Sequence, residues 1–366
     1  MENGERPDGS DRVGEQLPRE GEQRPECGQR RVSRFRAVLV GAGSMGKAWA
    51  GALVAHPEVE LVGWVDVVEE RAREAAGALG LTGTAVLADV ATAISGCSPD
   101  FVVDVSVPEA HYEVTATCLR RGVPVLGEKP MAATMAEARA LVELSERTST
   151  LFAVSQNRRY NQGLVAFKDL MAERLGGVAQ LNAEFYRAPH FGGFREEMAS
   201  PLLLDMAIHT FDAARYVTGT DAVSVVCSEL NPPWSWYEGS ACAVAELEMT
   251  GGLRFTYQGS WCARGFETSW DSSWRAVGRL GTALWDGTGA PVAEVELPGG
   301  DSTERVEAPP SGAFAGGIAG SLADFVSALG GGEPPMGECH DNIRSLAMVF
   351  AALESSRSGA RVAVEV

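Results

Sequence analysis

The chain has 366 residues, which is too long for one small domain and fits two packed domains. Its 31 lysines and arginines against 49 aspartates and glutamates leave a net charge of −18, which argues against nucleic acid or an anionic membrane as the main partner. Its seven cysteines form no Cys-x-x-Cys pair and no apolar run has membrane-spanning length, so we expect a cytoplasmic protein with reduced thiols.

Residues 1–33 are rich in Gly, Glu, Arg, Pro and Gln and hold almost no large apolar side chains, so we expect a disordered tail. Across 34–156, short apolar strands alternate with amphipathic helices. This alternation predicts an α/β nucleotide-binding domain with a doubly wound parallel sheet and ligands at the carboxyl ends of its strands. The predicted strands are 35–40, 59–66, 101–106, 123–126 and 151–155, and the predicted helices are 45–55, 69–79, 111–121 and 135–147.

The pattern changes at 157, and 157–366 is predicted to be an α+β domain that binds the substrate. Long alternating runs joined by tight turns are typical of an antiparallel sheet. One face of this sheet is expected to be free, which favours self-association. The predicted strands are 178–187, 223–230, 241–249, 253–261, 274–277, 282–285 and 292–297, and the predicted helices are 163–174, 202–217, 318–329 and 342–356.

Gly41-Ala42-Gly43-Ser44-Met45-Gly46 follows the first predicted strand and opens a helix. Gly41 allows a tight turn, Gly43 lets the backbone approach a pyrophosphate, and Gly46 lets helix and strand pack closely. The first helical N–H groups, at Ser44 and Met45, are then available to the phosphates.

Asp66 stands 20 residues after Gly46, at the end of the second predicted strand. An acidic side chain at this position accepts hydrogen bonds from a ribose diol and repels a 2′-phosphate, so NAD is preferred to NADP. The alternative role for Asp66 is a helix cap.

Glu128-Lys129-Pro130 follows the strand predicted over 123–126. A lysine at this strand end projects toward the crevice where a nicotinamide should lie, and Pro130 makes a cis peptide bond possible. The alternative is a surface lysine in a turn.

Asp205 and His209 stand four residues apart on the helix predicted over 202–217, so they share one face, and Asp212 continues it. The apolar flanks of this helix predict burial. Buried acids and imidazoles need partners, which either a functional site or a closed structural pair supplies.

Together with Asn157-Arg158-Arg159-Tyr160, these motifs resemble the Gfo/Idh/MocA family, which includes glucose–fructose oxidoreductase and inositol dehydrogenase type enzymes, over 34–366. The resemblance implies an NAD(P)-binding Rossmann domain, a second domain with an open-faced sheet, and homodimers or homotetramers. It also implies hydride transfer between nicotinamide and a secondary alcohol of a sugar, amino sugar or cyclitol.

Site roles follow from the same resemblance. Lys129 matches the active-site lysine, His209 the usual general base, and Asp205 the aspartate that precedes it. Ala207 and Ser200-Pro201 stand where the family often has glycine, which concerns the shape of the pocket. The resemblance assigns substrate contacts to Lys129, Arg158, Asp205, His209 and Asp212, and cofactor contacts to Ser106, Pro108, His111, Glu128 and Lys129.

In the expected reaction, His209 takes the hydroxyl proton, Lys129 stabilises the developing negative charge, and Asp205 orients His209 or the substrate. Lys129 as the base, with His209 as its helper, remains open. Two other readings are a regulatory sensor that binds NAD(P) and a sugar without turnover, and a tightly held cofactor that cycles between two sugars.

His190 lies in the loop expected over 188–200, just before the helix with Asp205, and is a candidate substrate contact. Trp234-Ser235-Trp236-Tyr237 is a candidate platform for the C–H face of a sugar. Packing or an interface is the alternative for both. No metal site is expected, because the five histidines are dispersed and do not pair with cysteines.

Overall fold

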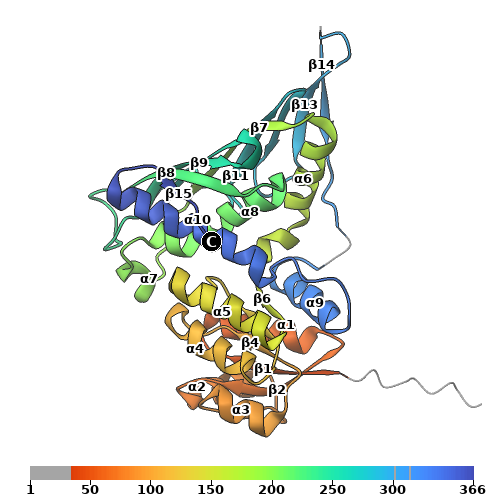
Figure 1. Cartoon of the computed structure of the whole chain (residues 1–366), viewed down its shortest axis with the longest axis vertical. Helices are drawn as coiled ribbons and strands as arrows, with labels where there is room; N and C mark the ends of the chain where they lie inside the picture. Colours follow the sequence, from red (N-terminus) through yellow and green to blue (C-terminus); the bar gives the residue numbers. More distant parts are fainter. Residues whose placement is uncertain (1–33, 301, 313–314) are drawn as a thin grey trace, which may run out of the picture. The chain divides into compact units, whose positions relative to one another are not determined.

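The computed structural model describes residues 34–300, 302–312 and 315–366, and the predicted tail over 1–33 lies outside the described residues. Two sheets organise this part of the chain (Figure 1). The predicted fold class, a parallel Rossmann sheet followed by a mainly antiparallel sheet, is confirmed. Among the described helices, none combines the length and the apolar character needed to cross a membrane.

The first sheet has six parallel strands in the order β3-β2-β1-β4-β5-β6. The strand order changes direction between β1 and β4, and sheets of this kind bind nucleotides at the carboxyl ends of those two strands. The strands are β1 (Phe35–Val40), β2 (Val59–Val65), β3 (Ala85–Leu87), β4 (Phe101–Asp104), β5 (Val125–Gly127) and β6 (Phe152–Val154). The helices are α1 (Ser44–Ala55), α2 (Glu69–Ala78), α3 (Val90–Cys97), α4 (Pro108–Leu119) and α5 (Met135–Thr148).

The predicted elements lack β3 and α3 because both are short: the strand has three residues and the helix eight. Neither is long enough to establish a clear hydrophobic period. The beginning of α3 depends on a cap, since the Asp89 carboxylate accepts a hydrogen bond from the Thr92 N–H at 2.8 Å.

The second sheet has nine strands in the order β14-β13-β12-β11-β7-β10-β9-β8-β15. Its pairs are antiparallel except β7 with β10, which are parallel at the centre of the sheet. The edge strands β14 and β15 were not predicted, because they are short and mostly exposed. The strands are β7 (Val178–Tyr186), β8 (Ala222–Leu230), β9 (Cys242–Met249), β10 (Arg254–Ser260), β11 (Ser273–Gly278), β12 (Gly281–Trp285), β13 (Val292–Glu296), β14 (Thr303–Glu307) and β15 (Val362–Ala363).

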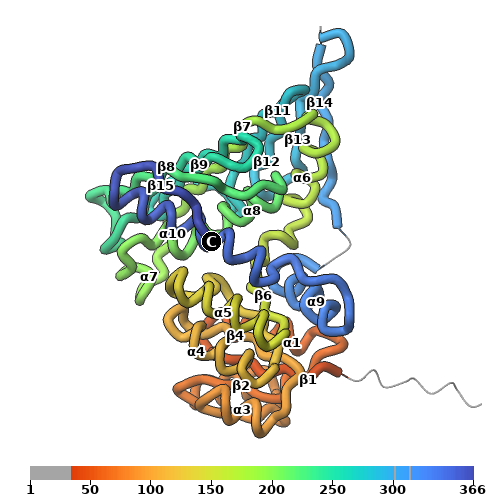
Figure 2. The backbone as a smooth tube through the Cα atoms, in the orientation of Figure 1, coloured from red at the N-terminus to blue at the C-terminus, as the bar shows by residue number. Residues whose placement is uncertain are grey.

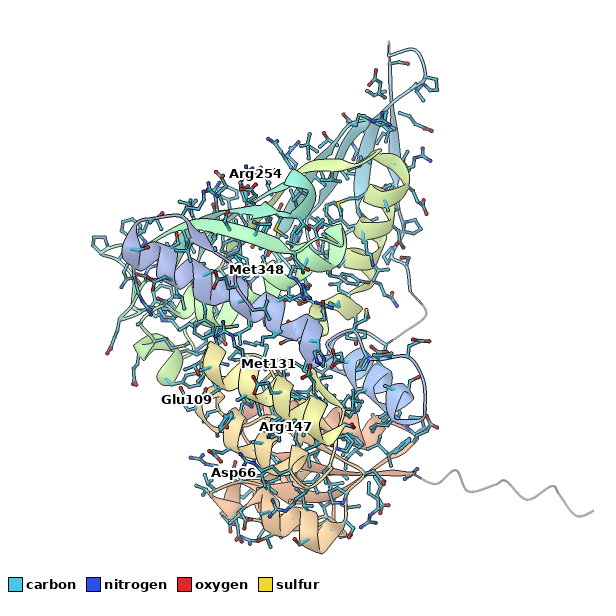
Figure 3. The ribbon with its side chains drawn as sticks, in the orientation of Figure 1. Asp66, Glu109, Met131, Arg147, Arg254 and Met348 are labelled. Carbon is cyan, nitrogen blue, oxygen red and sulfur yellow. The ribbon has the colours of Figure 1, made fainter. Side chains whose placement is uncertain are left out.

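Helices cover one face of this second sheet (Figure 1). Strand residues alternate accordingly: in β9, Ala245 and Leu247 are buried while Val244 is half exposed. On the face away from these helices, Val226, Val244 and Leu284 are more than a third exposed in the described part of the chain. The covering helices are α6 (Gln162–Arg174), α8 (Ile208–Thr218) and α10 (Cys339–Ser358); Met348 marks α10 and Arg254 marks β10 in Figure 3.

α9 (Gly317–Leu329) belongs to the last third of the chain but packs on the first sheet (Figure 2). Leu322, Phe325 and Val326 lie in one hydrophobic cluster with the side chains of β1, β2 and α1. The rings of Phe101 and Phe325 are 5.6 Å apart between centroids. The chain therefore returns to the nucleotide-binding sheet after completing the second one.

Candidate active site

The glycine turn after β1 has the geometry that a dinucleotide needs. Gly41 has φ 102°, and a Cβ there would overlap the Val105 carbonyl. A Cβ on Gly46 would overlap the carbonyl of Gly41, whereas a Cβ on Gly43 would meet no atom within 4 Å. Backbone atoms therefore fill the space beside Gly41 and Gly46, whereas the space beside Gly43 leaves room for a phosphate group.

The first turn of α1 supplies donors to this space. No side chain caps the helix at Gly43, and its first turn contains no acidic residue. The N–H groups at Ser44 and Met45 are therefore suited to bind phosphate oxygens. Trp64, which was not predicted as a site residue, holds the turn by donating from Nε1 to the Gly41 carbonyl at 2.9 Å.

Asp66 follows β2 and faces the same turn (Figure 3). Its Oδ2 accepts a hydrogen bond from the Ala42 N–H at 2.8 Å, and its Oδ1 accepts one from the Val68 N–H at 2.9 Å. The carboxylate thus holds the glycine turn, but it caps neither α1 nor α2, so the alternative role as a helix cap is wrong. Carboxylate oxygens have further acceptor capacity, so the predicted ribose contact stays a prediction.

A buried charged pair lies at the end of β4, on the predicted cofactor side. Nδ1 of His111 is 3.0 Å from Oδ2 of Asp104, and Ser106 donates from Oγ to Oδ1 of Asp104 at 2.6 Å. Burial acts to lower the pKa of His111, but Asp104 outweighs it and raises the pKa above its ordinary value. Pro108 occupies the first turn of α4, so this helix begins three residues before the predicted start. Asp104 was missed because it follows an uninterrupted apolar strand and no motif marks it.

Glu128 is buried, and burial raises the pKa of its carboxyl. Oε1 of Glu128 accepts from Nε1 of Trp49 at 2.8 Å, and Oε2 accepts from the N–H of Lys129 at 3.1 Å. The next peptide bond, Lys129–Pro130, is cis, as the sequence allowed. Glu128 therefore holds the backbone that carries Lys129, and its predicted cofactor contact stays a prediction.

Lys129 and Asp205 form the centre of the site. Nζ of Lys129 lies 2.8 Å from the Asp205 carbonyl oxygen and 2.8 Å from Oδ1 of its carboxylate. Nε of Arg195 lies 2.8 Å from Oδ2 of Asp205. Burial acts to raise the pKa of Asp205, but Lys129 and Arg195 outweigh it and hold the pKa below its ordinary value. Arg195, in the short helix α7 (Phe194–Glu197), was missed because the exposed loop around it has no recognisable pattern.

His209 lies next to this ion pair. The segment predicted as one α-helix begins as the π-helix η2 (Leu202–Ala207) and becomes α8 at Ile208, so Asp205 and His209 lie on different helix types. His209 is buried, and its Nδ1 has no hydrogen-bond partner among the described residues. Burial, Arg158 and Lys129 together lower the pKa of His209 well below its ordinary value. The imidazole is therefore neutral near pH 7 and can accept a proton.

Arg158 lies in the 3₁₀-helix η1 (Asn157–Tyr160). Its positive charge contributes to the lowered pKa of His209. Its Nε is 3.5 Å from Oδ1 of Asp271. Burial lowers the pKa of Arg158 to about 10, so the group remains charged near neutral pH. A pocket of about 700 Å³ opens beside Arg158 and is lined also by Trp270 and Asp271.

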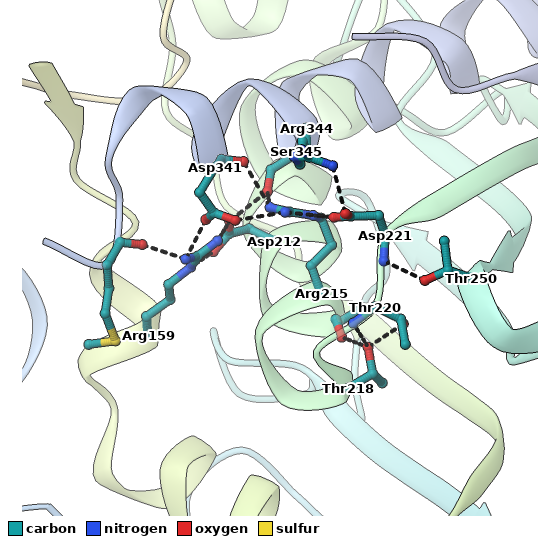
Figure 4. Close-up of polar contacts among 12 residues, drawn as sticks. Arg159, Asp212, Arg215, Thr218, Thr220, Asp221, Thr250, Asp341, Arg344 and Ser345 are labelled. Carbon is teal, nitrogen blue, oxygen red and sulfur yellow. Dashed lines mark hydrogen bonds and ion pairs between the residues drawn. The ribbon is translucent and has the colours of Figure 1, made fainter. Parts of the chain in front are cut away.

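Asp212 has structural partners instead of a free carboxylate (Figure 4). Arg159 donates from Nε to Oδ2 at 2.8 Å and from Nη2 to Oδ1 at 2.6 Å, and Ser345 donates from Oγ to Oδ1 at 2.6 Å. Asp212 is 1% exposed. Its predicted contact with a substrate stays a prediction, and these contacts favour a structural role that joins η1, α8 and α10.

His190 stacks on Trp236, with 3.8 Å between ring centroids and 21° between ring planes. The hydroxyl of Tyr237 donates to the Pro189 carbonyl at 2.9 Å. The loop that carries His190 therefore packs on the segment 234–237, which was the alternative interpretation for both. The side chain of Trp234 is 64% exposed. The predicted substrate contact of His190 stays a prediction.

One statement about histidines was wrong: Cys339 and His340 are neighbours. With Glu338 they place ligand-type atoms within 4.8 Å of one another. Nδ1 of His340 is 2.7 Å from Oε1 of Glu338, and Nε2 is 2.9 Å from Oε1 of Glu146. Both ring nitrogens are thus engaged by carboxylates of the chain itself.

Comparison with known proteins agrees with this geometry. A family model described as an oxidoreductase family with an NAD-binding Rossmann fold matches residues 35–156, and one for the GFO/IDH/MocA C-terminal domain matches 166–284. The chain is 24% identical over 339 residues to 1,5-anhydro-D-fructose reductase of Ensifer adhaerens, covering 89% of this chain and 98% of that protein. It is 30% identical over 237 residues to inositol 2-dehydrogenase of Streptomyces avermitilis, covering 60% and 67%.

A solved structure has the same fold over most of the chain. It is an oxidoreductase from Agrobacterium radiobacter in complex with NAD+, L-tartaric acid and magnesium, with a TM-score of 0.81 and 20% identity. The match covers 91% of this chain and 99% of that one. With its two matched domains, its open glycine turn and its relatives named as reductases and dehydrogenases, the chain belongs to the Gfo/Idh/MocA family of NAD-binding oxidoreductases.

Proposed function

We propose that the chain reversibly oxidises a secondary alcohol of a sugar, amino sugar or cyclitol to the ketone, with Lys129, Asp205 and His209 as its catalytic residues. The observation that carries this proposal is the ammonium group of Lys129 beside a buried, unprotonated imidazole. Reductase and inositol dehydrogenase activities among the relatives support the same chemistry.

The glycine turn and the first N–H groups of α1 would hold NAD, which would supply the hydride acceptor for the substrate carbon. His209 takes the hydroxyl proton, since its imidazole lies beside Lys129 and its pKa is lowered well below its ordinary value, which keeps it neutral near pH 7. Lys129 donates a hydrogen bond to the same oxygen and stabilises the negative charge that develops there. Asp205 fixes the position of Nζ of Lys129 through its carbonyl and its carboxylate.

The low pKa of His209 predicts the acidic side of the pH profile. A base works only above its pKa, and the pKa of His209 is lowered, so kcat/KM should stay constant down through pH 6.5 and fall only at lower pH. A fall centred at or above pH 6.5 in the wild type would argue against His209 as the base.

The finer features of the proposal have separate support. NAD is preferred to NADP because the Asp66 carboxylate lies beside the turn that would hold the pyrophosphate, where it would meet the ribose diol and repel a 2′-phosphate. The open, partly apolar face of the second sheet is proposed to join two or four copies. The six described cysteines are free thiols, in keeping with a cytoplasmic protein.

The decisive experiment is a spectrophotometric screen of NAD and NADP reduction with sugars, amino sugars and inositols. We expect reduction of NAD by at least one polyol and loss of turnover in Lys129→Met and His209→Asn, with NADH binding retained. Sugar and cofactor binding without any turnover would identify a sensor instead. A copurifying cofactor with no net release of NADH would identify cycling between two sugars.

A further inference from the structure

Arg195 is a site residue to which the proposed function gives no chemical role. It approaches Asp205 at the second carboxylate oxygen, with its Nε 2.8 Å from Oδ2, while Nζ of Lys129 is 2.8 Å from Oδ1. One carboxylate therefore stands between two cations. Lys129 is assigned to the reacting oxygen of the substrate, and Arg195 lies at the other oxygen of the same Asp205 carboxylate.

Aromatic rings hold the guanidinium of Arg195 in place. Its Cζ lies 5.4 Å from the ring centroid of Phe191 and 4.8 Å from that of Phe194. Phe191 in turn packs on Trp261 and Trp270, with centroid distances of 5.6 and 6.3 Å. The orientation of the planar guanidinium is thus defined before any ligand binds.

The outer edge of this guanidinium is unused. Its two terminal nitrogens make no hydrogen bond to any residue in the described part of the chain, and the side chain is 32% exposed. Such an edge offers two parallel N–H donors, a geometry that matches the two oxygens of a carboxylate. A neutral hydroxyl would satisfy only one of them.

The charge around the site favours an anion. Lys129 and Arg158 act on the neutral His209, and Arg195 pairs with Asp205 beside it, so three cations meet two carboxylates in a chain whose net charge is −18. A third acidic side chain, Glu128, is buried, and burial raises the pKa of its carboxyl. The cations are Lys129, Arg158 and Arg195, and the carboxylates are Asp205 and Asp271.

Two further carboxylates, Glu196 and Glu197, share helix α7 with Arg195. Glu196 accepts a hydrogen bond from the Gly192 N–H at 2.8 Å, which leaves the outer edge of Arg195 to a ligand. A local excess of positive charge in an acidic protein concentrates anions at that place.

We propose that the substrate is a hydroxy acid of the sugar-acid class, whose carboxylate is bound by Arg195 while its hydroxyl lies between Lys129 and His209. Since Arg195 and Lys129 are joined through one carboxylate, the acid group and the reacting carbon are near neighbours in the substrate, as in uronic and aldonic acids. This assignment rests on the proposed function and names the substrate class for it.

The first test compares matched pairs of substrates in the wild-type enzyme with NAD. D-glucuronate is paired with D-glucose, D-galacturonate with D-galactose, and D-gluconate with D-sorbitol. We expect kcat/KM to favour the acid at least tenfold in one pair, because a charged, bidentate contact is stronger than a hydrogen bond to a neutral hydroxyl. Preferred turnover of the neutral members overturns the acid assignment alone, whereas cofactor binding without turnover of any of these compounds or of the amino sugars and inositols in the screen above overturns the proposed function.

The second test changes the guanidinium. In Arg195→Gln we expect the acid-to-neutral ratio of kcat/KM to fall at least tenfold, mainly through a higher KM for the acid. Arg195→Lys keeps the charge but loses the two parallel N–H donors of the guanidinium. Its acid-to-neutral ratio of kcat/KM should therefore lie between those of the wild type and Arg195→Gln. An equal loss on acid and neutral substrates in Arg195→Gln would overturn the proposal, because it would mean that Arg195 only positions Asp205.

The matched control is Arg264→Gln. Arg264 also stacks on an aromatic ring, 5.8 Å from the centroid of Trp236, but it forms no ion pair with any described residue. Its substitution should leave the acid-to-neutral ratio unchanged. Bound NADH, measured by its fluorescence, reports that each variant is folded.

Discussion

Asp205 and Asp212 are two carboxylates seven residues apart on the consecutive helices η2 and α8, and each is bound by an arginine, yet their surroundings differ. The Asp205 side chain is 15% exposed, and its partners Lys129 and Arg195 keep donors for a further ligand. The Asp212 side chain is 2% exposed, and Arg159 and Ser345 occupy both of its oxygens. The comparison teaches that unused donors, and not the presence of charge, distinguish the site from a structural ion pair.

Substitution of Lys129, the cation at the centre of the site, should give the largest loss of activity. Lys129→Met removes the charge that stabilises the developing alkoxide, so we expect kcat to fall about 10²–10³-fold. Single-turnover reduction of NAD measures the chemical step directly. Lys168→Met, which removes an ammonium group stacked 4.2 Å from the Tyr216 ring centroid, is the matched control and should keep its activity. Comparable rates in the two variants would remove Lys129 from the mechanism.

Breaking the structural pair should act on folding instead. Asp212→Ala leaves Arg159 buried beside a single remaining acidic partner, Asp341, and we expect it to lower the free energy of unfolding by about 3–5 kcal/mol. Urea denaturation followed by fluorescence measures this loss. Asp205→Asn should cost less stability, because its surroundings are more open. If Asp212→Ala unfolds like the wild type but loses substrate affinity, the predicted substrate role of Asp212 is correct.

The same contrast explains what the sequence can predict. The glycine turn, Asp66 and Lys129 were found because each follows a strand, and local spacing alone specifies their chemistry. His209 and Asp205 were found as a pair on a helix, although the π-helical turn was not, because no residue of 202–207 signals it.

Residues that act through distant partners were not found. Asp104, Trp49 and Arg195 acquire their roles from contacts with residues 7, 79 and 10 positions away, and only folding brings these partners together. Asp212 was assigned to the substrate through the family resemblance, and its spacing from His209 places it on the same helix face. Its partner Arg159 lies 53 residues away, on an element whose packing the spacing does not reveal.

Asp66 tests whether one carboxylate can both hold the glycine turn and discriminate NAD from NADP. Asp66→Ser should shift the kcat/KM ratio of NAD to NADP about tenfold toward NADP, because a 2′-phosphate is no longer repelled. Steady-state kinetics with both cofactors measure the ratio. Asp100→Ser removes a carboxylate that likewise accepts from a backbone N–H, that of Arg36 at 2.7 Å, and should leave the ratio unchanged. An equal loss with both cofactors would limit Asp66 to holding the turn.

The smallest effect concerns an exposed ion pair. His340 lies between Glu338 and Glu146, and these carboxylates raise the pKa of its imidazole. Protonated His340 should therefore stabilise the fold below the unfolded-state pKa of about 6.5, and this contribution is lost as pH rises through the higher folded-state pKa. Because His340 is half exposed, solvent screening limits the contribution to below about 1 kcal/mol.

His340→Gln should abolish this small pH dependence, which denaturation at pH 5.5 and pH 8.5 measures in both proteins. Glu146→Gln should remove part of it, since Glu338 still pairs with the imidazole. An unchanged difference in stability between the two pH values in His340→Gln would assign the dependence to another group. His340, which is exposed to water and paired with both Glu338 and Glu146, should therefore contribute less to stability than the buried pair of Asp212 and Arg159.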